Sequence, residues 1–338
     1  MVEVDADLAN RNTLRLPARA QWFAQPESES ALVALLQDAR YQGLPRIVIG
    51  DGSNLLLRAD LDALVIRPAM RGVHVVEEDD RQVLVEVMAG ENWDALVADT
   101  VRRGWQGLEN LSLIPGSVGA APYQNIGAYG VELADVLESL TAFSLEDGQS
   151  REFSRDECCF AYRDSFFKSH EPHRWVITRV RLRLNKSPSW VLGYADLRQR
   201  FEALPPAEQN AAGVRELVCA LRRSKLPDPQ QLPNAGSFFK NPVIPAPQFR
   251  QLQQRYPAIV GYPQGDDRVK VAAGWLIEQA GWKGKRDGDI GMHAQQALVL
   301  VNYGAATGEQ VQAFAERVRA SVLDMFSITL EQEPVVLP

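Results

Sequence analysis

Two stretches of the chain alternate between apolar and polar positions, which is the period of a β-strand. Val176–Leu184 alternates along most of its length, and Val83–Val87 shows a similar pattern over a shorter run. Successive side chains of a strand point to opposite faces of its sheet, so alternation predicts one face on a core and one in solvent. We therefore predict half-solvated strands between residues 68 and 185.

Apolar positions at helical spacing predict helices in other parts of the chain. After Ser28, the residues Ala31, Leu32, Leu35 and Leu36 recur at that spacing. Further helices are expected at Trp93–Arg103 and near residues 211–223, 268–280 and 307–325, a last strand at Ile328–Glu331, and a mixed linker carrying Tyr194 at residues 188–206.

The segment Ile114–Gly130 is rich in glycine and alanine and almost uncharged. Glycine lets a backbone approach a ligand closely, and consecutive N–H groups without shielding side chains form concavities that bind anions such as a diphosphate. Gln124 and Asn125 add neutral donors and acceptors suited to the amide-rich ring of a flavin. Taken alone, the segment could also be a tight surface loop.

A second glycine segment favours the binding interpretation. The β-branched run Arg46–Ile49 enters the turn Gly50–Asn54, and an apolar run leaves it, which predicts strand, loop and strand. Leu55 stands where the Rossmann fingerprint needs its third glycine, so that motif is absent. Two such loops, roughly 60 residues apart, indicate a dinucleotide bound between two subdomains.

Composition narrows the possible partners. The 338 residues are 46% hydrophobic and 23% charged, as in ordinary globular proteins, and can form two or three domains. The net charge of −7 argues against nucleic-acid binding, so an anionic substrate must meet local basic residues. No apolar run approaches the length of a membrane span, and the acidic start Met1–Asp7 lacks a signal-peptide core.

The three cysteines do not indicate a disulfide framework or a metal site. Cys158, Cys159 and Cys219 are too few and too irregularly spaced for a disulfide framework or a zinc site. We predict that they are small buried hydrophobic residues, that no metal is bound, and that the protein is cytoplasmic.

An ordered series of motifs resembles the UDP-N-acetylenolpyruvoylglucosamine reductase family over nearly the whole chain. The motifs are Gly50–Leu55, Gly107–Glu109, Ile114–Gly116, Gln124–Gly130, Tyr162–Lys168, Lys225–Pro229, Asn234–Pro242, Ala272–Glu278 and Leu330–Glu333. Each is moderately specific alone, whereas the order is highly specific. With Tyr194, the chain resembles the form of the family that has a tyrosine-bearing substrate loop.

The resemblance implies an α+β fold: a vanillyl-alcohol-oxidase-type FAD-binding fold of two α+β subdomains plus a carboxyl-terminal α+β substrate-binding domain. The subdomains would be residues 1–67, completed by the tail 327–338, and residues 68–206 with the substrate loop. Residues 207–326 would bind the UDP-sugar. The implied partners are FAD, NADPH and UDP-N-acetylenolpyruvoylglucosamine in peptidoglycan precursor synthesis, and we expect a monomer.

The same resemblance implies the catalytic residues. Arg163 would bind the enolpyruvyl carboxylate, since a guanidinium can grip a carboxylate through two hydrogen bonds; the alternative is a surface arginine paired with Asp164. Ser237 would donate the proton; the alternative is a helix N-cap serine. Glu333 would position the carboxylate, with Glu331 as the fallback because Pro334 and the short tail depart from the family's usual ending.

Two larger sets complete the implied site. The residues for FAD are Gly50, Asp51, Gly52, Ser53, Asn54, Leu55, Ile114, Pro115, Gly116, Gly119, Ala120, Gln124, Asn125, Gly127, Ala128, Tyr129 and Gly130. The residues for the UDP-sugar are Tyr194, Arg222, Lys225, Asn241, Tyr262, Lys270, Lys283 and Gln296.

Two other functions stay open at this stage. Another flavin oxidase or dehydrogenase could share the fold, because a fold alone does not give a function. A non-catalytic nucleotide-sugar binder is the third possibility, although Arg163 and Ser237 are both present.

Overall fold

A computed structural model describes all residues, 1–338. The chain forms two compact units. The first contains residues 1–6, 20–51 and 62–224, and the second contains residues 7–19, 52–61 and 225–338. The sequence analysis expected three parts, residues 1–67 with the tail 327–338, residues 68–206 and residues 207–326, and this division into domains stays a prediction.

The first unit begins with a four-stranded sheet in the order β1-β2-β5-β3. Its strands are β1 (Val2–Asp7), β2 (Arg19–Ala24), β5 (Leu61–Ile66) and β3 (Arg46–Val48). Helix α1 (Glu29–Gln37) packs on this sheet through Leu32 and Leu36. The helix begins where the sequence predicts, because the Ser28 hydroxyl accepts a hydrogen bond from the N–H of Ala31.

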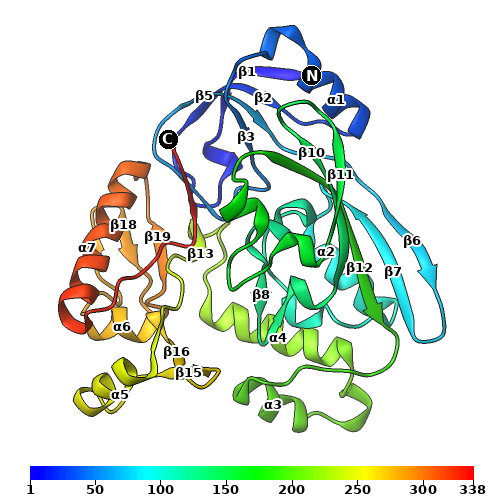
Figure 1. Cartoon of the computed structure of the whole chain (residues 1–338). Coiled ribbons are helices and arrows are strands. Elements are labelled where there is room, and N and C mark those ends of the chain that lie inside the picture. Colours follow the sequence, from blue (N-terminus) through cyan, green and yellow to red (C-terminus); the bar gives the residue numbers. More distant parts are fainter. The chain divides into compact units, whose positions relative to one another are not determined.

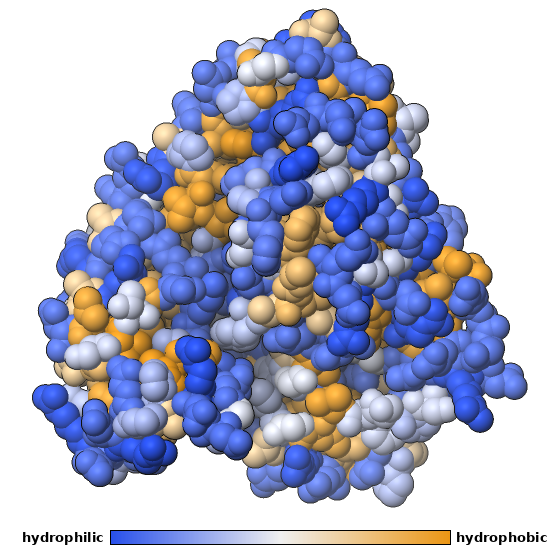
Figure 2. Space-filling model, in the orientation of Figure 1, coloured by the Kyte–Doolittle hydropathy of each residue, from blue (hydrophilic) through white to orange (hydrophobic).

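The rest of the first unit is built on an antiparallel five-stranded sheet in the order β11-β10-β12-β7-β6. The strands are β6 (Val73–Glu78), β7 (Gln82–Met88), β10 (Leu137–Ser144), β11 (Ser150–Ser154) and β12 (Trp175–Asn185). Buried and partly exposed positions alternate along β12 after Thr178, which confirms the half-solvated strand. The hairpin β6–β7 forms one long edge of this sheet, and Figure 2 shows apolar surface near β6, where Val75 and Val76 are exposed.

Three helices and a small hairpin complete this unit (Figure 1). They are α2 (Trp93–Arg102), α3 (Ala195–Glu202), α4 (Ala211–Lys225) and the hairpin of β8 (Gly127–Ala128) with β9 (Val131–Glu132). Helices α3 and α4 share a core in which Leu197 and Phe201 meet Val214 and Val218.

The second unit holds two further sheets and three helices. One sheet has the order β13-β19-β18-β17 and the other β14-β16-β15. The strands are β13 (Asn234–Ser237), β14 (Val243–Pro245), β15 (Gly261–Gln264), β16 (Arg268–Val271), β17 (Arg286–Asp287), β18 (Ile290–Met292) and β19 (Val299–Asn302). The helices are α5 (Ala246–Arg255), α6 (Ala273–Gln279) and α7 (Gly308–Phe326), of which α7 covers the sheet beside β18 and β19 (Figure 1).

The end of the chain forms a separate parallel pair, β20 (Val335–Leu337) with β4 (Leu55–Leu57). The strand predicted at Ile328–Glu331 is therefore placed wrongly, because ladder pairing with β4 begins only at Val335. The predicted helix at 268–280 is also too long, since its first residues form β16.

The predicted linker contains helix α3, which the sequence analysis missed because only Leu197 and Phe201 of that helix are buried. Cys158 and Cys219 are buried thiols as predicted, whereas Cys159 is exposed, in a left-handed turn, which corrects that prediction. None of the helices carries an apolar stretch long enough for a bilayer span.

Candidate active site

Two glycine loops come into contact in the first unit. An ideal Cβ built on Gly50 would lie 2.7 Å from the Cβ of Ala120 and 3.0 Å from the Oγ of Ser117. A side chain at residue 50 would collide with the second loop, so glycine is required there. The structure thus brings together two segments that the sequence assigns to one ligand.

Backbone N–H groups are available where these loops meet. Those of Gly50, Asp51, Gly116 and Ser117 donate to no acceptor within the protein. Gly116 has a φ of 130°, which favours glycine. The Asp51 carboxylate pairs with Arg67 at 2.6 Å, which neutralises the nearest negative charge. Such a set of donors fits the diphosphate of a dinucleotide.

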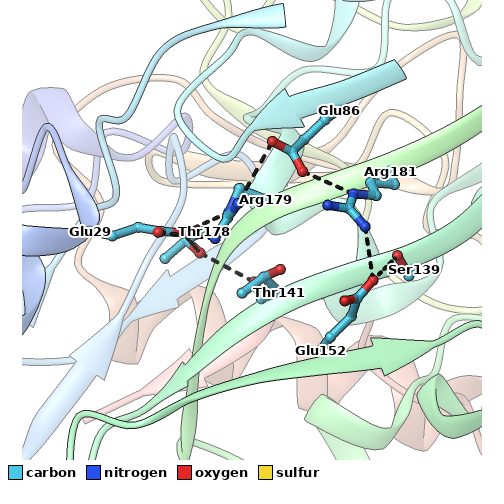
Figure 3. A network of polar contacts seen from close by, with 8 residues as sticks. All are labelled: Glu29, Glu86, Ser139, Thr141, Glu152, Thr178, Arg179 and Arg181. Atoms are coloured by element: carbon cyan, nitrogen blue, oxygen red, sulfur yellow. Dashed lines mark hydrogen bonds and ion pairs between the residues drawn. The ribbon is translucent and has the colours of Figure 1, made fainter. Parts of the chain in front are cut away.

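A network of charged side chains crosses the five-stranded sheet (Figure 3). Glu29, the first residue of α1, accepts hydrogen bonds at 2.8 Å from the hydroxyl of Thr178 and from Nε of Arg179. Ion pairs then continue from Arg179 to Glu86, Arg181 and Glu152. The network therefore fastens the first helix to the sheet.

Backbone hydrogen bonds connect this network to the second glycine loop. The N–H of Gly119 donates to the carbonyl of Ala89 at 2.9 Å, and the N–H of Ala89 donates to the carbonyl of Thr178 at 2.9 Å. An ideal Cβ on Gly119 would lie 2.5 Å from the Cβ of Ala89, so the loop lies directly against the sheet. The position of the loop therefore depends on the strand that carries Thr178.

Arg163 occupies the tip of a tight turn. Ala161 and Asp164 exchange two backbone hydrogen bonds at 3.1 Å, and Arg163 has a φ of 56°, which is unusual for a side chain of this size. Its Nη2 donates to the carbonyl of Gly127 at 2.8 Å. An ideal Cβ on Gly127 would lie 3.2 Å from Nη1 of Arg163, so glycine allows this approach.

The turn is held against the glycine loop from both sides. The side chain of Asn125 donates to Ala161 at 3.2 Å and to Glu132 at 2.7 Å, and Ser165 donates to the carbonyl of Tyr123 at 2.7 Å. Asn125 therefore uses its amide within the protein. The carboxylate of Asp164 accepts bonds from the neighbouring Ser165 and Ser169, which argues against its being the main partner of Arg163.

Helix α4 brings a second arginine near Arg163. Nε of Arg222 is buried without a hydrogen-bond partner, and no carboxylate pairs with this side chain. Burial lowers the pKa of the Arg222 guanidinium, and the charge of Arg163 acts in the same direction. A cation held in this way is stabilised by an anionic ligand.

The position of α4 is set by a charged contact with α2. Both Nη atoms of Arg215 bind the carboxylate of Asp94, at 2.7 and 3.1 Å. The same carboxylate accepts the N–H of Leu113, just before the glycine loop, at 2.7 Å. Asp94 and Arg215 are site-building residues that the sequence analysis missed, because no local pattern connects them.

Two tyrosines lie over this part of the first unit. The rings of Tyr129 and Tyr194 meet edge to face with centroids 5.4 Å apart. Burial raises the pKa of Tyr129, and Tyr194 and Asp196 add to the rise, so the phenol stays neutral at physiological pH. Tyr194 is 46% exposed, as a residue that contacts a ligand requires.

Ser237 ends strand β13 in the second unit. The strand pairs with β19 at Asn234 and at Ser237, with an irregularity between them at which Gly236 takes a φ of 70°. The side chain of Asn234 accepts the N–H of Gly236 at 2.8 Å and fixes this bend. Ser237 is therefore a strand residue, and the helix N-cap alternative is wrong.

Glu333 lies on the segment that pairs with the residues after Ser237. Its N–H donates to the carbonyl of Phe238 at 2.9 Å, and its carbonyl accepts from the amide of Asn54 at 3.2 Å. The side chain of Glu331 instead pairs with Lys240 at 2.8 Å and is 72% exposed. The structure thus brings Glu333 close to the Ser237 strand and turns Glu331 to solvent.

The second unit also gathers part of the predicted sugar-nucleotide set. The side chain of Asn241 accepts the N–H of Ala273 at the start of α6, and an ideal Cβ on Gly274 would lie 3.3 Å from Oε1 of Gln296. Tyr262 and Lys270 face each other across the β15–β16 ladder. Lys283 pairs with Glu278 of α6 at 2.9 Å, and Lys225 is exposed at the end of α4.

The predicted site residues divide between the units. Arg163, Tyr194, Arg222 and the second glycine loop belong to the first unit, together with Gly50 and Asp51. The second unit contains Gly52–Leu55, Ser237, Glu333 and the other residues predicted to bind the sugar nucleotide.

Comparison with known proteins agrees with this arrangement. A model of an FAD-binding domain matches residues 20–154, and a model of the UDP-N-acetylenolpyruvoylglucosamine reductase carboxyl-terminal domain matches residues 228–337. The fold resembles that of 6-hydroxy-D-nicotine oxidase from Arthrobacter nicotinovorans, with a TM-score of 0.55, 16% identity and coverage of 97% of this chain and 86% of that one. The protein is therefore an FAD-dependent oxidoreductase with a vanillyl-alcohol-oxidase-type fold.

More similar relatives define the family. UDP-N-acetylenolpyruvoylglucosamine reductase from Pseudomonas aeruginosa is 55% identical over 96% of this chain and 95% of its own length. The reductase of Alcanivorax borkumensis is 54% identical over 99% and 96%. The crystal structure of the Thermus caldophilus enzyme matches with a TM-score of 0.70 and 27% identity, over 100% of this chain and 98% of that one. This chain belongs to the UDP-N-acetylenolpyruvoylglucosamine reductase family.

Proposed function

We propose that this chain reduces the enolpyruvyl group of UDP-N-acetylenolpyruvoylglucosamine to give UDP-N-acetylmuramate, a precursor of peptidoglycan, with NADPH as reductant. The family supplies the reaction, and one observation supports it in this chain. Arg163 is held in a strained turn, and Glu333 is fastened beside the strand of Ser237. Each catalytic candidate therefore has a defined local position.

The residues of the glycine loops fit FAD. The unpaired N–H groups of Gly50, Asp51, Gly116 and Ser117 would hold its diphosphate, and the close contact at Gly50 leaves no room for a side chain. FAD, when bound, supplies a hydride that it has taken from NADPH.

Arg163 and Arg222 would receive the enolpyruvyl carboxylate. Hydride addition at the terminal carbon places negative charge on the adjacent carbon and on this carboxylate, and fixed cations stabilise that charge as it develops. Arg222 lacks a protein counter-ion and is partly removed from water, so its charge is available to a ligand. Arg163 is pre-oriented by its bond to Gly127.

Ser237 would then deliver the proton. Its hydroxyl would protonate the carbon next to the carboxylate, which completes the addition of one hydride and one proton across the double bond. Glu333 would orient the carboxylate or the proton donor, since its backbone is fixed at both the N–H and the carbonyl. The exposed ion pair of Glu331 supports Glu333 as the functional carboxylate.

The remaining predicted residues would bind the UDP-sugar. Five of them lie around α6 and the β15–β16 ladder: Asn241, Tyr262, Lys270, Lys283 and Gln296. The two lysines are cations suited to a diphosphate. Tyr194 and Lys225 would add contacts. We also propose a monomer that works in the cytoplasm; an exposed free thiol at Cys159 suits a reducing compartment, and light scattering would test the monomer.

Anaerobic stopped-flow absorbance tests the function directly. Mixing the flavoprotein with NADPH should bleach the flavin, and UDP-N-acetylenolpyruvoylglucosamine should then rapidly restore the oxidised spectrum. Restoration by air but not by the sugar nucleotide would identify a different flavin enzyme on this fold. A purified protein without flavin would indicate a sugar-nucleotide binder.

A further inference from the structure

A buried asparagine joins two functional segments of the first unit. Asn110 is 1% exposed and lies in a short turn directly after the Gly107–Glu109 motif. Its Nδ2 donates to the carbonyl of Tyr129 at 2.9 Å and to the carbonyl of Val191 at 2.8 Å. One amide group therefore bridges the glycine loop and the segment that carries Tyr194.

The two bridged segments touch at two further points. The rings of Tyr129 and Tyr194 pack edge to face, and an ideal Cβ on Gly130 would lie 3.4 Å from a methyl group of Val191. Both contacts depend on how far residues 187–194, which form no helix or strand, lie from the glycine loop. The bridge of Asn110 spans that separation.

Other contacts hold residues 187–194 to Gln106 and to helix α3. The N–H of Ser189 donates to Gln106 at 3.3 Å, and Arg198 of α3 donates to the carbonyl of Leu192 at 3.0 Å. Trp190 packs on Phe201 with ring centroids 5.2 Å apart. Trp190, Leu192 and Tyr129 also pack on the core that α3 and α4 share, so packing already brings the segment near the loop. Asn110 adds hydrogen bonds that fix the two backbones directly.

The buried amide of Asn110 is paired at its donor end only. The Oδ1 atom of Asn110 is buried without any hydrogen-bond partner. An unpaired buried acceptor is unfavourable, and the two donor bonds offset this cost while they fix the geometry of the two backbone segments.

We propose that Asn110 is a positioning residue that fixes the Tyr194 segment against the flavin loop at Tyr129. The inference rests on the proposed function, in which Tyr194 contacts the UDP-sugar. Without the bridge, residues 187–194 should sample wider positions, and substrate binding should weaken. The reaction of NADPH with the flavin should change less than substrate binding, because Asn110 reaches the flavin loop only at the carbonyl of Tyr129 and not at the N–H groups proposed to hold the diphosphate.

The test compares Asn110→Leu and Asn110→Asp with Gln106→Leu, which removes an anchor of the same segment that does not reach Tyr129. Amide hydrogen exchange over residues 187–194 should be about tenfold faster in both Asn110 variants than in the Gln106 variant. The KM for UDP-N-acetylenolpyruvoylglucosamine should rise about tenfold, with flavin reduction at saturating NADPH within twofold of the parent. Asn110→Gln, which keeps the donor group, should recover part of the KM.

Several outcomes would overturn the proposal. Unchanged exchange and KM in Asn110→Asp would show that the bridge does not position the segment. Equal changes in the Gln106 and Asn110 variants would indicate general loosening of the segment. If the parent protein bleaches with NADPH but ignores the sugar nucleotide, the proposed function fails, while the exchange data still decide whether Asn110 positions the segment. If Asn110→Leu does not fold, Asn110→Asp and Asn110→Gln carry the comparison.

Discussion

Replacing Asp94 by asparagine should weaken both the stability of the first unit and substrate binding. Asp94 receives three hydrogen bonds, two from Arg215 and one from the N–H of Leu113. Asparagine can still accept from Leu113, but its amide nitrogen would face the guanidinium and its charge is lost. Arg215 would then be left as a largely buried cation, since its side chain is 19% exposed.

The structure sets the size of the expected loss. A hydrogen bond to a charged group contributes about 1.5–3 kcal/mol, and removing one partner of a fully buried pair costs about 3–5 kcal/mol. Because this pair is partly exposed and one bond survives, we expect a loss of about 2 kcal/mol in the free energy of unfolding. Arg222 lies two turns beyond Arg215 on α4, so the KM for the sugar nucleotide should rise several-fold.

The loss in the free energy of unfolding on replacing Asp94 should depend on pH. Burial alone would raise the pKa of Asp94, but the hydrogen bonds from Arg215 and Leu113 outweigh it, and the pKa is lowered in the folded protein. A lowered folded pKa means that the carboxylate stabilises the protein above the pKa of the unfolded state and that this stabilisation is lost as pH falls through the folded pKa. The difference between parent and variant should therefore be full at pH 7 and shrink below about pH 4.

Urea unfolding at pH 7, followed by circular dichroism and by flavin release, measures the effect. Asp99→Asn is the control, because Asp99 lies on the same helix and pairs with the exposed Arg103. An exposed pair contributes about 0–1 kcal/mol, so the control should change little. If Asp94→Asn loses no more stability than Asp99→Asn, or if the difference is the same at pH 7 and at about pH 3, the assigned role of Asp94 is refuted.

Three further predictions concern the catalytic residues. Ser237→Ala should keep flavin reduction by NADPH but slow the reoxidation of the flavin by substrate about 10²–10⁴-fold in stopped flow, because it removes a proton donor; reoxidation at the parent rate would place the donor elsewhere. Arg163→Lys should lower steady-state kcat at least tenfold, because a point charge does not replace a two-pronged grip; a kcat within twofold of the parent would exclude that grip. Glu333→Gln should lose most turnover whereas Glu331→Gln should stay near the parent, and the reverse order would assign the role to Glu331.

Local sequence patterns correctly predicted the helices and strands whose ends are fixed by neighbouring residues in the chain. The helix after Ser28 begins with the side-chain cap that its sequence indicates, and the strand–loop–strand around Gly50 appears as β3 and β4. Polar helices were harder to predict. In α5, Ala246 is the only buried residue and most positions are glutamine or arginine, so its apolar face is narrow. Contacts with β14 and β16 hold the helix.

The resemblance to a family predicted which residues form the candidate site, but not what holds them. Arg163 was predicted from its motif, whereas the turn that fixes it depends on a bond to Gly127, 36 positions earlier in the chain. Glu333 was preferred and Glu331 was kept as the fallback, because Pro334 and the short tail depart from the family's usual ending. Pairing of the chain end with residues 238–240 separates them, and this pairing has no signature in either segment alone.

The residues that escaped prediction share one property: each acts through a partner far away in the sequence. Asp94 and Arg215 are 121 positions apart, and Asn110 and Val191 are 81 apart. A single sequence shows the type of each residue but not its partner, so a buried asparagine looks like any other turn residue. Residues that bind a ligand can be predicted from the residue types in a motif. Residues that position them can be identified only once the folded structure shows their partners. Substitutions at Asp94 and Asn110 should therefore alter substrate binding although neither residue belongs to a motif that the family resemblance identifies.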